Sequence, residues 1–378
     1  MCHRNFLARR DARWWGIGPV ILLVLCVTSC QATDAQRPVP KEVRLPIIAG
    51  NTWASDVAVS NDGRRLLISA SPRYDGWASK QAGIWVVDLA AAKAPHQLTS
   101  GHVDAGPCWA GNEKQVLFVR QMSAEVSGIW AVNLQTGREY PVFSLEDWSA
   151  WTLAAAPAGS LGASLVLRGG PPPVAAIVVF DWTSGRREFW SGSPSASPTL
   201  SHGPVWSPEG RYIAFFAESQ TDPRLTAVRL DTKTMKTTVV STPYESRMLP
   251  VRDRPVLGGL GNRLAFSAPL RAGRRQPVTR VALAEVDFRA KRSRQTTAFT
   301  VADGRVSQAV VNPAFPREVA IVSLSGGVHM VRVFRQGAER FRARPALGPT
   351  WSADGRMLAY LIPHDKAGIV RLHDGKQR

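Results

Sequence analysis

Short apolar runs, each introduced by a polar turn, recur along the chain and predict β-strands. Three segments share the fullest form of this pattern, at Ser60–Ile68, Ser207–Phe215 and Ser352–Tyr360, and Gly258–Phe266 is a looser copy. In each of them glycine suits the turn position that needs a positive φ, and the apolar run enters a buried strand. Beyond residue 29 no stretch shows helical periodicity over about twelve residues. The pattern therefore predicts an all-β protein.

The turn-and-strand pattern recurs at a nearly constant spacing. Weaker copies are centred on Val116–Phe118, Leu165–Leu167 and Val319–Ile321. We call the first apolar residue of each run its anchor, and the anchors are residues 66, 116, 165, 213, 264, 319 and 358. A period near 50 residues, here 50, 49, 48, 51, 55 and 39 between successive anchors, is typical of propellers and other repeat folds.

Two further elements occur in phase with the anchors. A Gly-Pro-x-Trp motif ends seven residues before an anchor at Trp109, Trp206 and Trp351. After the anchors, Ile84–Leu89 and Ile129–Leu134 share the pattern Ile-Trp-x-Val-Asp/Asn-Leu. Each unit then contains four short strands, as in a propeller blade. We expect the three tryptophans to pack between blades rather than to form a stacking platform in the central channel.

The last unit is too short to supply four strands by itself. After Leu358 it offers one more strand, Gly368–Leu372, before the chain ends. The segment Glu42–Ile48 precedes the first full unit and is suited to supply the missing outer strand. Pairing the two segments would close the ring and remove its open edges. We therefore predict a β-propeller over 42–378 with about seven four-stranded blades, six being the alternative.

The first thirty residues have the features of an export signal. A basic stretch, residues 1–15, is followed by the twelve-residue apolar run Gly16–Val27, whereas a membrane-spanning helix needs about 20 residues. Val27-Thr28-Ser29-Cys30 comes next and resembles the bacterial lipobox. The resemblance implies a signal peptide over 1–29, acylation of Cys30 with palmitate or a similar chain, and a tether over 30–41. The protein would then be anchored on the outer face of the cell membrane or on the periplasmic side of an outer membrane.

The repeat itself resembles a known family of exported propellers. Ser-Pro-Glu-Gly-Arg at Ser207 and Ser-Ala-Asp-Gly-Arg at Ser352, together with Ile84–Leu89 and Thr136-Gly137-Arg138, are similar to the WD40-like repeats of the TolB family and of the LpqB propeller. The resemblance covers about 42–378 and implies a non-catalytic propeller that binds proteins in the cell envelope. TolB resembles a six-bladed ring with an extra domain, which differs from the seven units counted here.

The charge of the chain indicates an acidic partner. Forty-seven Lys and Arg residues oppose 29 Asp and Glu residues, for a net charge of +18. Such an excess favours anionic lipid, an anionic wall polymer or an acidic protein, and export makes nucleic acid an unexpected partner. We predict a basic surface that contacts an anionic partner; the alternative is a merely solvated face. Its members are Arg271, Arg274, Arg275, Arg289, Lys291, Arg292 and Arg294.

Recognisable catalytic motifs are missing from the sequence. We find no Gly-x-Ser-x-Gly nucleophile elbow and no pair of histidines at metal-ligand spacing. Cys108 is the one cysteine in the chain after Cys30. We therefore expect no catalytic residue, no metal and no cofactor. The predicted function is a non-catalytic scaffold for an envelope protein partner, and the alternative is an enzyme acting on a carbohydrate or another small substrate in the central channel.

Overall fold

The computed structural model describes most of the unit Pro38–Arg378. The described residues are 41–44, 52–72, 82–89, 94–123, 126–144, 148–169, 174–191, 197–198, 203–218, 222, 224–245, 255–258, 260–270, 280–301, 305–362 and 366–371. Their regular structure is entirely β. This part of the chain contains no membrane-spanning helix. Residues 1–40, which include the predicted signal peptide, Cys30 and nearly all of the tether, lie outside it.

The described strands form seven antiparallel sheets, which we number as blades in chain order. Blade 1 contains β2 (Thr52–Val59), β3 (Arg65–Pro72), β4 (Gly83–Asp88) and β5 (His96–Gln97). Blade 2 contains β6 (Asp104–Trp109), β7 (Gln115–Gln121), β8 (Ser127–Asn133) and β9 (Glu139–Ser144). Blade 3 contains β10 (Trp148–Ala155), β11 (Leu161–Arg168), β12 (Val174–Asp181) and β13 (Arg187–Trp190).

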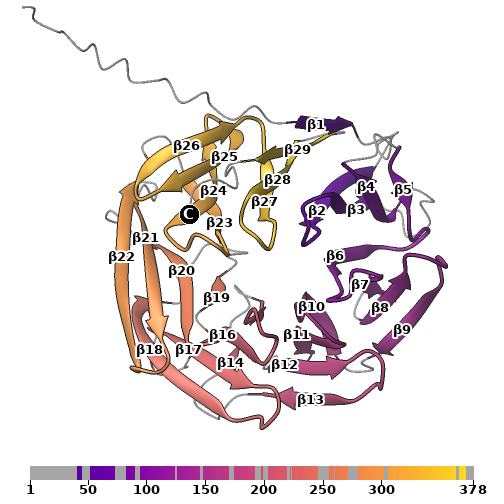
Figure 1. Ribbon diagram of the computed structural model, residues 1–378, viewed down its shortest axis with the longest axis horizontal. Coiled ribbons are helices and arrows are strands. Elements are labelled where there is room, and N and C mark those ends of the chain that lie inside the picture. Colours follow the sequence, from indigo (N-terminus) through magenta and orange to yellow (C-terminus); the bar gives the residue numbers. More distant parts are fainter. Residues whose placement is uncertain are drawn as a thin grey trace, which may run out of the picture. The chain divides into compact units, whose positions relative to one another are not determined.

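The remaining blades follow the same order from the innermost strand outward (Figure 1). Blade 4 contains β14 (Ser197–Pro198), β15 (Val205–Trp206), β16 (Tyr212–Glu218), β17 (Arg224–Asp231) and β18 (Thr237–Glu245). Blade 5 contains β19 (Val256–Gly258), β20 (Arg263–Leu270), β21 (Arg280–Asp287) and β22 (Arg292–Thr300). Blade 6 contains β23 (Arg305–Val311), β24 (Glu318–Ser325), β25 (Val328–Arg335) and β26 (Ala338–Ala343). Blade 7 contains β27 (Leu347–Trp351), β28 (Met357–Ile362), β29 (Lys366–Arg371) and β1 (Lys41–Arg44).

Strands from the two ends of the chain close the ring. β1 pairs antiparallel with β29, with Glu42 opposite Gly368, so the predicted closure is confirmed, with strands of 41–44 and 366–371. Residues 45–48 of the predicted strand lie outside the described part. Because β1 is the outermost strand of blade 7, this blade obtains its four strands from both ends of the chain.

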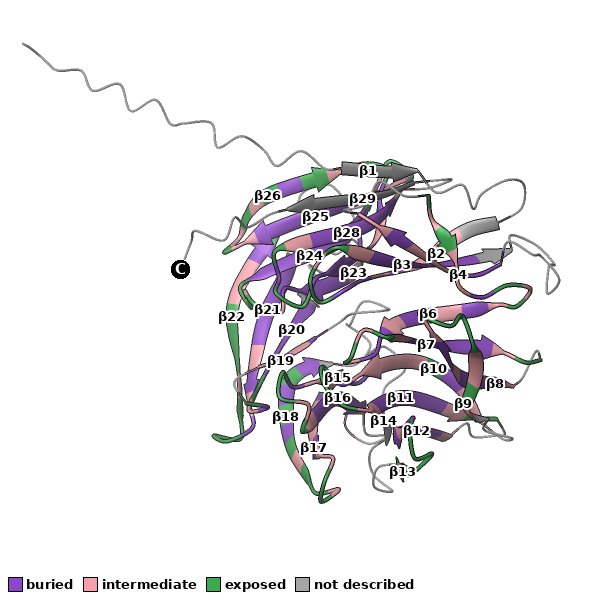
Figure 2. Ribbon diagram, turned by 45° about the vertical axis from the view of Figure 1, so that its right-hand side comes forward, coloured by how far each residue is buried: buried purple, intermediate pink, exposed green. Residues whose placement is uncertain are grey.

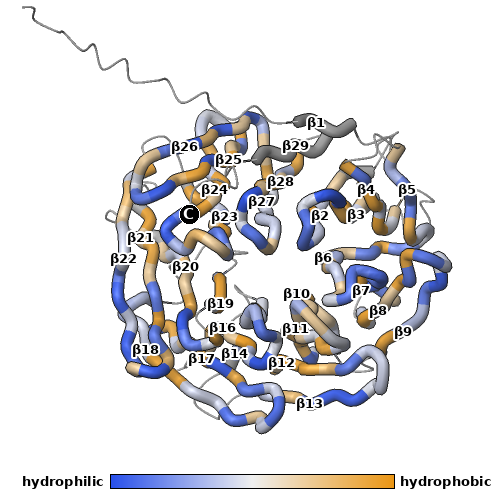
Figure 3. Tube along the Cα trace, viewed as in Figure 1, coloured by the Kyte–Doolittle hydropathy of each residue, from blue (hydrophilic) through white to orange (hydrophobic). Residues whose placement is uncertain are grey.

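Apolar packing lies in the seams between blades. Seven buried clusters occur among the described residues, and each joins two neighbouring blades, including blade 7 with blade 1. A middle strand therefore buries both of its faces, which explains continuous apolar runs such as Leu66–Ile68. Figure 2 shows the buried residues concentrated in the middle strands, and Figure 3 shows hydrophilic residues along the outermost strand β22.

The predicted turns form as the sequence indicates. In blade 1 the Ser60 Oγ is 2.5 Å from an oxygen of Asp62, which also accepts the Arg64 N–H at 2.9 Å. Gly63 then takes a φ of 70°, a conformation that glycine adopts without steric penalty. Ser352, Asp354 and Gly355 repeat this turn in blade 7.

One anchor was placed wrongly. In blade 3 the residue that pairs like Val116 of blade 2 is Gly162, because Ala155 pairs with Gly162 as Trp109 pairs with Val116. The predicted anchor, Leu165, lies three residues further along the strand. A side chain has no room at position 162, since a Cβ there would lie 2.3 Å from the Phe180 ring. The glycine therefore interrupted the apolar pattern on which the prediction relied.

Candidate functional site

The three tryptophans of the Gly-Pro-x-Trp motif fasten blades together. The indole Nε1 of Trp206 donates to the carbonyl of Ala154 in blade 3 at 3.0 Å. Trp351 donates to Val310 of blade 6 at 3.0 Å, and Trp109 to Ala58 of blade 1 at 3.4 Å. Each bond therefore crosses a seam to the innermost strand of the preceding blade. The inter-blade interpretation is correct, and these tryptophans are not a ligand platform.

The innermost strands share a second feature, a break in register near the axis of the ring. The breaks occur in five described strands, β2, β6, β10, β23 and β27. In β2 the extra residue is Ser55, in β10 it is Trp151 and in β23 it is Ser307. A bulge turns a side chain away from the regular alternation, and bulges are frequent next to active sites. In three of the blades, the bulge thus places an extra side chain, Ser55, Trp151 or Ser307, on an innermost strand.

Trp151 is the most distinctive of these side chains. It is 59% exposed, whereas Trp109 and Trp351 are 8% and 7% exposed. Its indole lies on an innermost strand, at the register break of β10, and is open to solvent, which makes Trp151 a candidate for contact with a ligand. The sequence held a usable signal, because Trp151 precedes Gly162 by the same eleven residues by which Ser55 precedes Leu66. The misplaced anchor in blade 3 concealed that equivalence.

A carboxylate lies between two of the bulges. Asp56 accepts a hydrogen bond from the Ser55 hydroxyl at 3.2 Å and a longer one from the Gly106 N–H at 3.5 Å. Ser55 and Gly106 are bulge residues of β2 and β6. The Asp56 side chain is half-buried and lies on an innermost strand. It is therefore a carboxylate placed where a ligand at the axis could reach it.

A second carboxylate nearby is fully engaged. Both oxygens of Asp104 accept hydrogen bonds from Arg120 at 2.8 Å, and Thr99 donates to Asp104 at 2.5 Å. Arg120 also pairs with Glu139 at 2.7 Å. Burial lowers the pKa of Arg120, but the hydrogen bonds and charges of Asp104 and Glu139 outweigh burial and raise it. Asp104 therefore has a structural role, which leaves Asp56 as the more available carboxylate.

The predicted basic surface is described in part. Arg271, Arg274 and Arg275 lie outside the described residues. The other members, at the β21–β22 turn and the start of β22, are exposed, namely Arg289, Lys291, Arg292 and Arg294. Carboxylates oppose two of them, because Arg292 and Arg294 share a cavity of about 110 Å³ with Arg263, Glu285 and Asp287. Within the described ranges no three His, Cys, Asp or Glu side chains gather as a metal site.

Comparison with solved structures places the fold among known propellers. The chain is similar to an oligogalacturonate lyase in complex with manganese, with a TM-score of 0.62, 14% identity and coverage of 89% of this chain and 97% of that one. It is similar to an acylaminoacyl peptidase, with a TM-score of 0.57, 11% identity and coverage of 87% and 52%, so it spans about half of the peptidase. No family model and no curated protein matches the sequence.

TolB is also among the solved propellers that the chain resembles. TolB from Acinetobacter baumannii matches with a TM-score of 0.44 and 12% identity, covering 85% of this chain and 65% of that one. An alignment at this score carries no argument for shared partners. The structure therefore shows a propeller, and no family model places it in the TolB family.

The expectation that the chain is not an enzyme needs correction. The similar propellers include a lyase and a peptidase, and the lyase is covered over almost its whole length. Identities of 11–14% show the fold and not the reaction. That fold is nevertheless one that enzymes use, and missing sequence motifs gave no ground for excluding catalysis, because a propeller builds its centre from residues far apart in the chain.

Proposed function

We propose that this protein is a propeller enzyme that binds a carbohydrate at the centre of the ring. The observation that carries the proposal is Trp151, bulged from the innermost strand β10 with 59% of its surface exposed. A sugar ring presents an apolar C–H face and a polar rim, so it packs on an indole while its hydroxyl groups bond to neighbouring polar groups. Ser307, which is bulged from β23 and exposed, would supply one such group.

Asp56 is the residue we propose for proton transfer. Cleavage of a glycosidic bond needs a group that gives or takes a proton at the reacting sugar, and carboxylates commonly perform this step. The hydrogen bonds from Ser55 and Gly106 orient the Asp56 carboxylate between two innermost strands. The whole-length likeness to an oligogalacturonate lyase supports an acidic polysaccharide as the substrate class within this proposal.

We also propose that the enzyme acts outside the cytoplasm, anchored through acyl chains on Cys30. The apolar run Gly16–Val27 and the Val27–Cys30 motif support this location. A propeller held at a membrane by the tether would meet polymers of the envelope or of the surroundings. An anionic polymer would also suit the net charge of +18.

Replacing Trp151 with alanine should weaken carbohydrate binding about tenfold or more and leave the fold intact, because the exposed indole makes its main contact with the ligand. Affinity would be measured by calorimetry with oligogalacturonate and with neutral cello- and xylo-oligosaccharides. Asp56→Asn should keep the affinity and lose cleavage. Cleavage would be measured by the release of new reducing ends and of unsaturated uronates. The split between the two variants separates stacking from proton transfer.

Phe189→Ala provides the matched control. Phe189 is an aromatic residue with 42% exposure on the outermost strand β13, so its loss should change neither affinity nor cleavage. Failure of the wild-type protein to bind or cleave any of these carbohydrates would overturn the proposal. Equal binding by wild type and Trp151→Ala would remove Trp151 from the site.

A further inference from the structure

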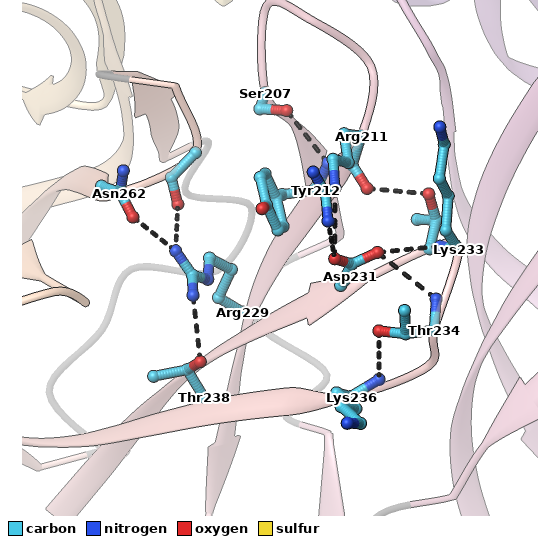
Figure 4. Close-up of polar contacts among 12 residues, drawn as sticks. Ser207, Arg211, Tyr212, Arg229, Asp231, Lys233, Thr234, Lys236, Thr238 and Asn262 are labelled. Carbon is cyan, nitrogen blue, oxygen red and sulfur yellow. Dashed lines mark hydrogen bonds and ion pairs between the residues drawn. The ribbon is translucent and has the colours of Figure 1, made fainter.

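Polar contacts link several pairs of neighbouring blades. They lie at the edge of the blades that carries the turn between the first and second strands. Between blades 1 and 2, Arg65 pairs with Glu113 at 2.7 Å. Between blades 4 and 5, Arg229 donates to the side-chain oxygen of Asn262 at 2.5 Å, as Figure 4 shows. Between blades 6 and 7, Asn312 donates to the carbonyl of Gly355 at 2.8 Å. These contacts lie between groups of opposite or complementary polarity.

The seam between blades 5 and 6 is built differently. Arg263 directly precedes the anchor Leu264, as Arg65 precedes Leu66. Arg65 meets Glu113 on the first turn of the next blade, but the corresponding turn of blade 6 carries Arg317. Arg263 instead pairs within its own blade, with Glu285 at 3.4 Å. Two blades therefore present arginines to the same seam.

A pocket of about 530 Å³ opens at this seam. Blade 5 contributes Arg263 and the apolar Val256 and Ala265, and blade 6 contributes Phe315 and Arg335. Val256 and Ala265 belong to the apolar core between the two blades, so the pocket rests on a packed layer. Its volume lies within the range of about 300–1,000 Å³ that is usual for small-molecule sites.

The charge of this pocket is unbalanced. Its lining holds four arginines and two glutamates, namely Arg263, Arg294, Arg317, Arg335, Glu285 and Glu318. Arg263 and Arg294 share Glu285. Glu318 is 2% exposed and accepts a hydrogen bond from Asn312 at 2.7 Å. Arg317 and Arg335 form no ion pair with any described residue, and Arg335 lies 5.8 Å from the centroid of the Phe315 ring.

We propose that this pocket binds a small anionic ligand that carries a carboxylate or phosphate group on an apolar or sugar body. A guanidinium presents paired N–H donors that match the oxygens of either group. Arg317 and Arg335 bind the oxyanion, and the Phe315 ring and Val256 pack against the body. The anion fills the place that a glutamate has in the seam between blades 1 and 2. The pocket is separate from the proposed carbohydrate site at Trp151.

Calorimetry on the full-length protein in detergent tests the proposal. The probes are citrate, trigalacturonate, inorganic phosphate and, as the uncharged comparison, maltotriose. In the Trp151→Ala variant, which weakens the proposed carbohydrate site, we expect at least one anion to bind with one site per chain and maltotriose not to bind. The doubly substituted variant Arg317→Gln with Arg335→Gln should bind that anion at least tenfold more weakly. The preferred probe then identifies carboxylate or phosphate as the recognised group.

A matched variant separates the pocket from general charge. Arg138→Gln with Arg340→Gln removes two exposed arginines that lie outside the pocket, and it should bind the anion as wild type does. Equal weakening in both double variants would overturn the proposal, as would binding by none of the anions or binding only to vesicles of anionic phosphatidylglycerol. Anion binding that survives in Trp151→Ala would show that the pocket acts independently of the carbohydrate site.

Discussion

At the scale of single residues, the contrast between Asp56 and Asp104 decides which carboxylate can act. Both lie on innermost strands, and Ser69 connects their surroundings by donating to the Asp104 carbonyl at 2.5 Å and by accepting a hydrogen bond from Ser55. Asp104 is fully buried and bound at both oxygens by Arg120, whereas Asp56 is half-buried. A ligand would have to displace Arg120 to reach either oxygen of Asp104, so Asp56 is the more accessible of the two carboxylates.

Removing Arg120 should destabilise the protein strongly. Arg120→Met leaves the Asp104 carboxylate buried without its cation, and loss of one partner of a buried ion pair typically costs about 3–5 kcal/mol. Replacing both residues, as Asp104→Leu with Arg120→Met, should recover part of that loss, because no buried charge remains. Urea unfolding of the wild type and the two variants, followed by tryptophan fluorescence, measures the differences. A single variant as stable as the wild type would contradict the structural role assigned to the pair.

At the scale of the strand, the innermost strands combine two roles within a few residues. One end can carry a bulge, as in β6. The other end carries the position that pairs with the anchor, from which Trp109, Trp206 and Trp351 donate a hydrogen bond to the preceding blade. In blade 3 the corresponding position holds Ala155, and the tryptophan of this strand, Trp151, lies at the bulge. The same residue type therefore serves packing in three blades and is exposed at the axis in a fourth.

The strand roles lead to a graded prediction for the tryptophans. Trp351→Phe keeps an aromatic ring but leaves the buried Val310 carbonyl without its donor, which should lower the free energy of unfolding by about 1–3 kcal/mol. Trp109→Phe should have a smaller effect, because its hydrogen bond is longer at 3.4 Å. Trp151→Phe should have almost none. Thermal unfolding of the three variants measures these differences. A larger loss of stability in Trp151→Phe than in the other two variants would contradict the roles assigned to the tryptophans.

Sequence periodicity predicted the blades well because each one repeats the same local chemistry. The turn at Ser60–Gly63 is specified by neighbours in the chain. An apolar run such as Leu66–Ile68 indicates directly from its composition that it is buried. The sites escaped prediction for the opposite reason. Arg263, Arg317 and Arg335 form one pocket only because blades 5 and 6 are adjacent, and Gly162 disguised the register that would have placed Trp151 at the axis.

At the scale of the whole molecule, the proposed export and anchoring depend on the segment that precedes β1. Acylation of Cys30 should allow the wild-type protein to incorporate labelled palmitate and to fractionate with membranes, because two or three chains hold a protein durably where one does not. Cys30→Ala should take up no label and accumulate as the larger precursor. Cys108→Ala is the control and should behave as the wild type. Absence of label from the wild type would refute lipid attachment at Cys30.

The closure of blade 7 has a consequence for the order in which the molecule is made. Glu42 and Gly368 are paired neighbours, yet they are 368 − 42 = 326 positions apart in the sequence. Strand β1 leaves the ribosome before the other described strands, and its partner β29 is made only after the strands of blades 1 to 6. Blades 1 to 6 are contiguous in sequence and can fold as they emerge, whereas blade 7 must wait. A chain truncated shortly before Lys366 would thus retain six complete blades and an unsatisfied edge, which gives quality-control proteases a simple way to distinguish an unfinished ring from a finished one.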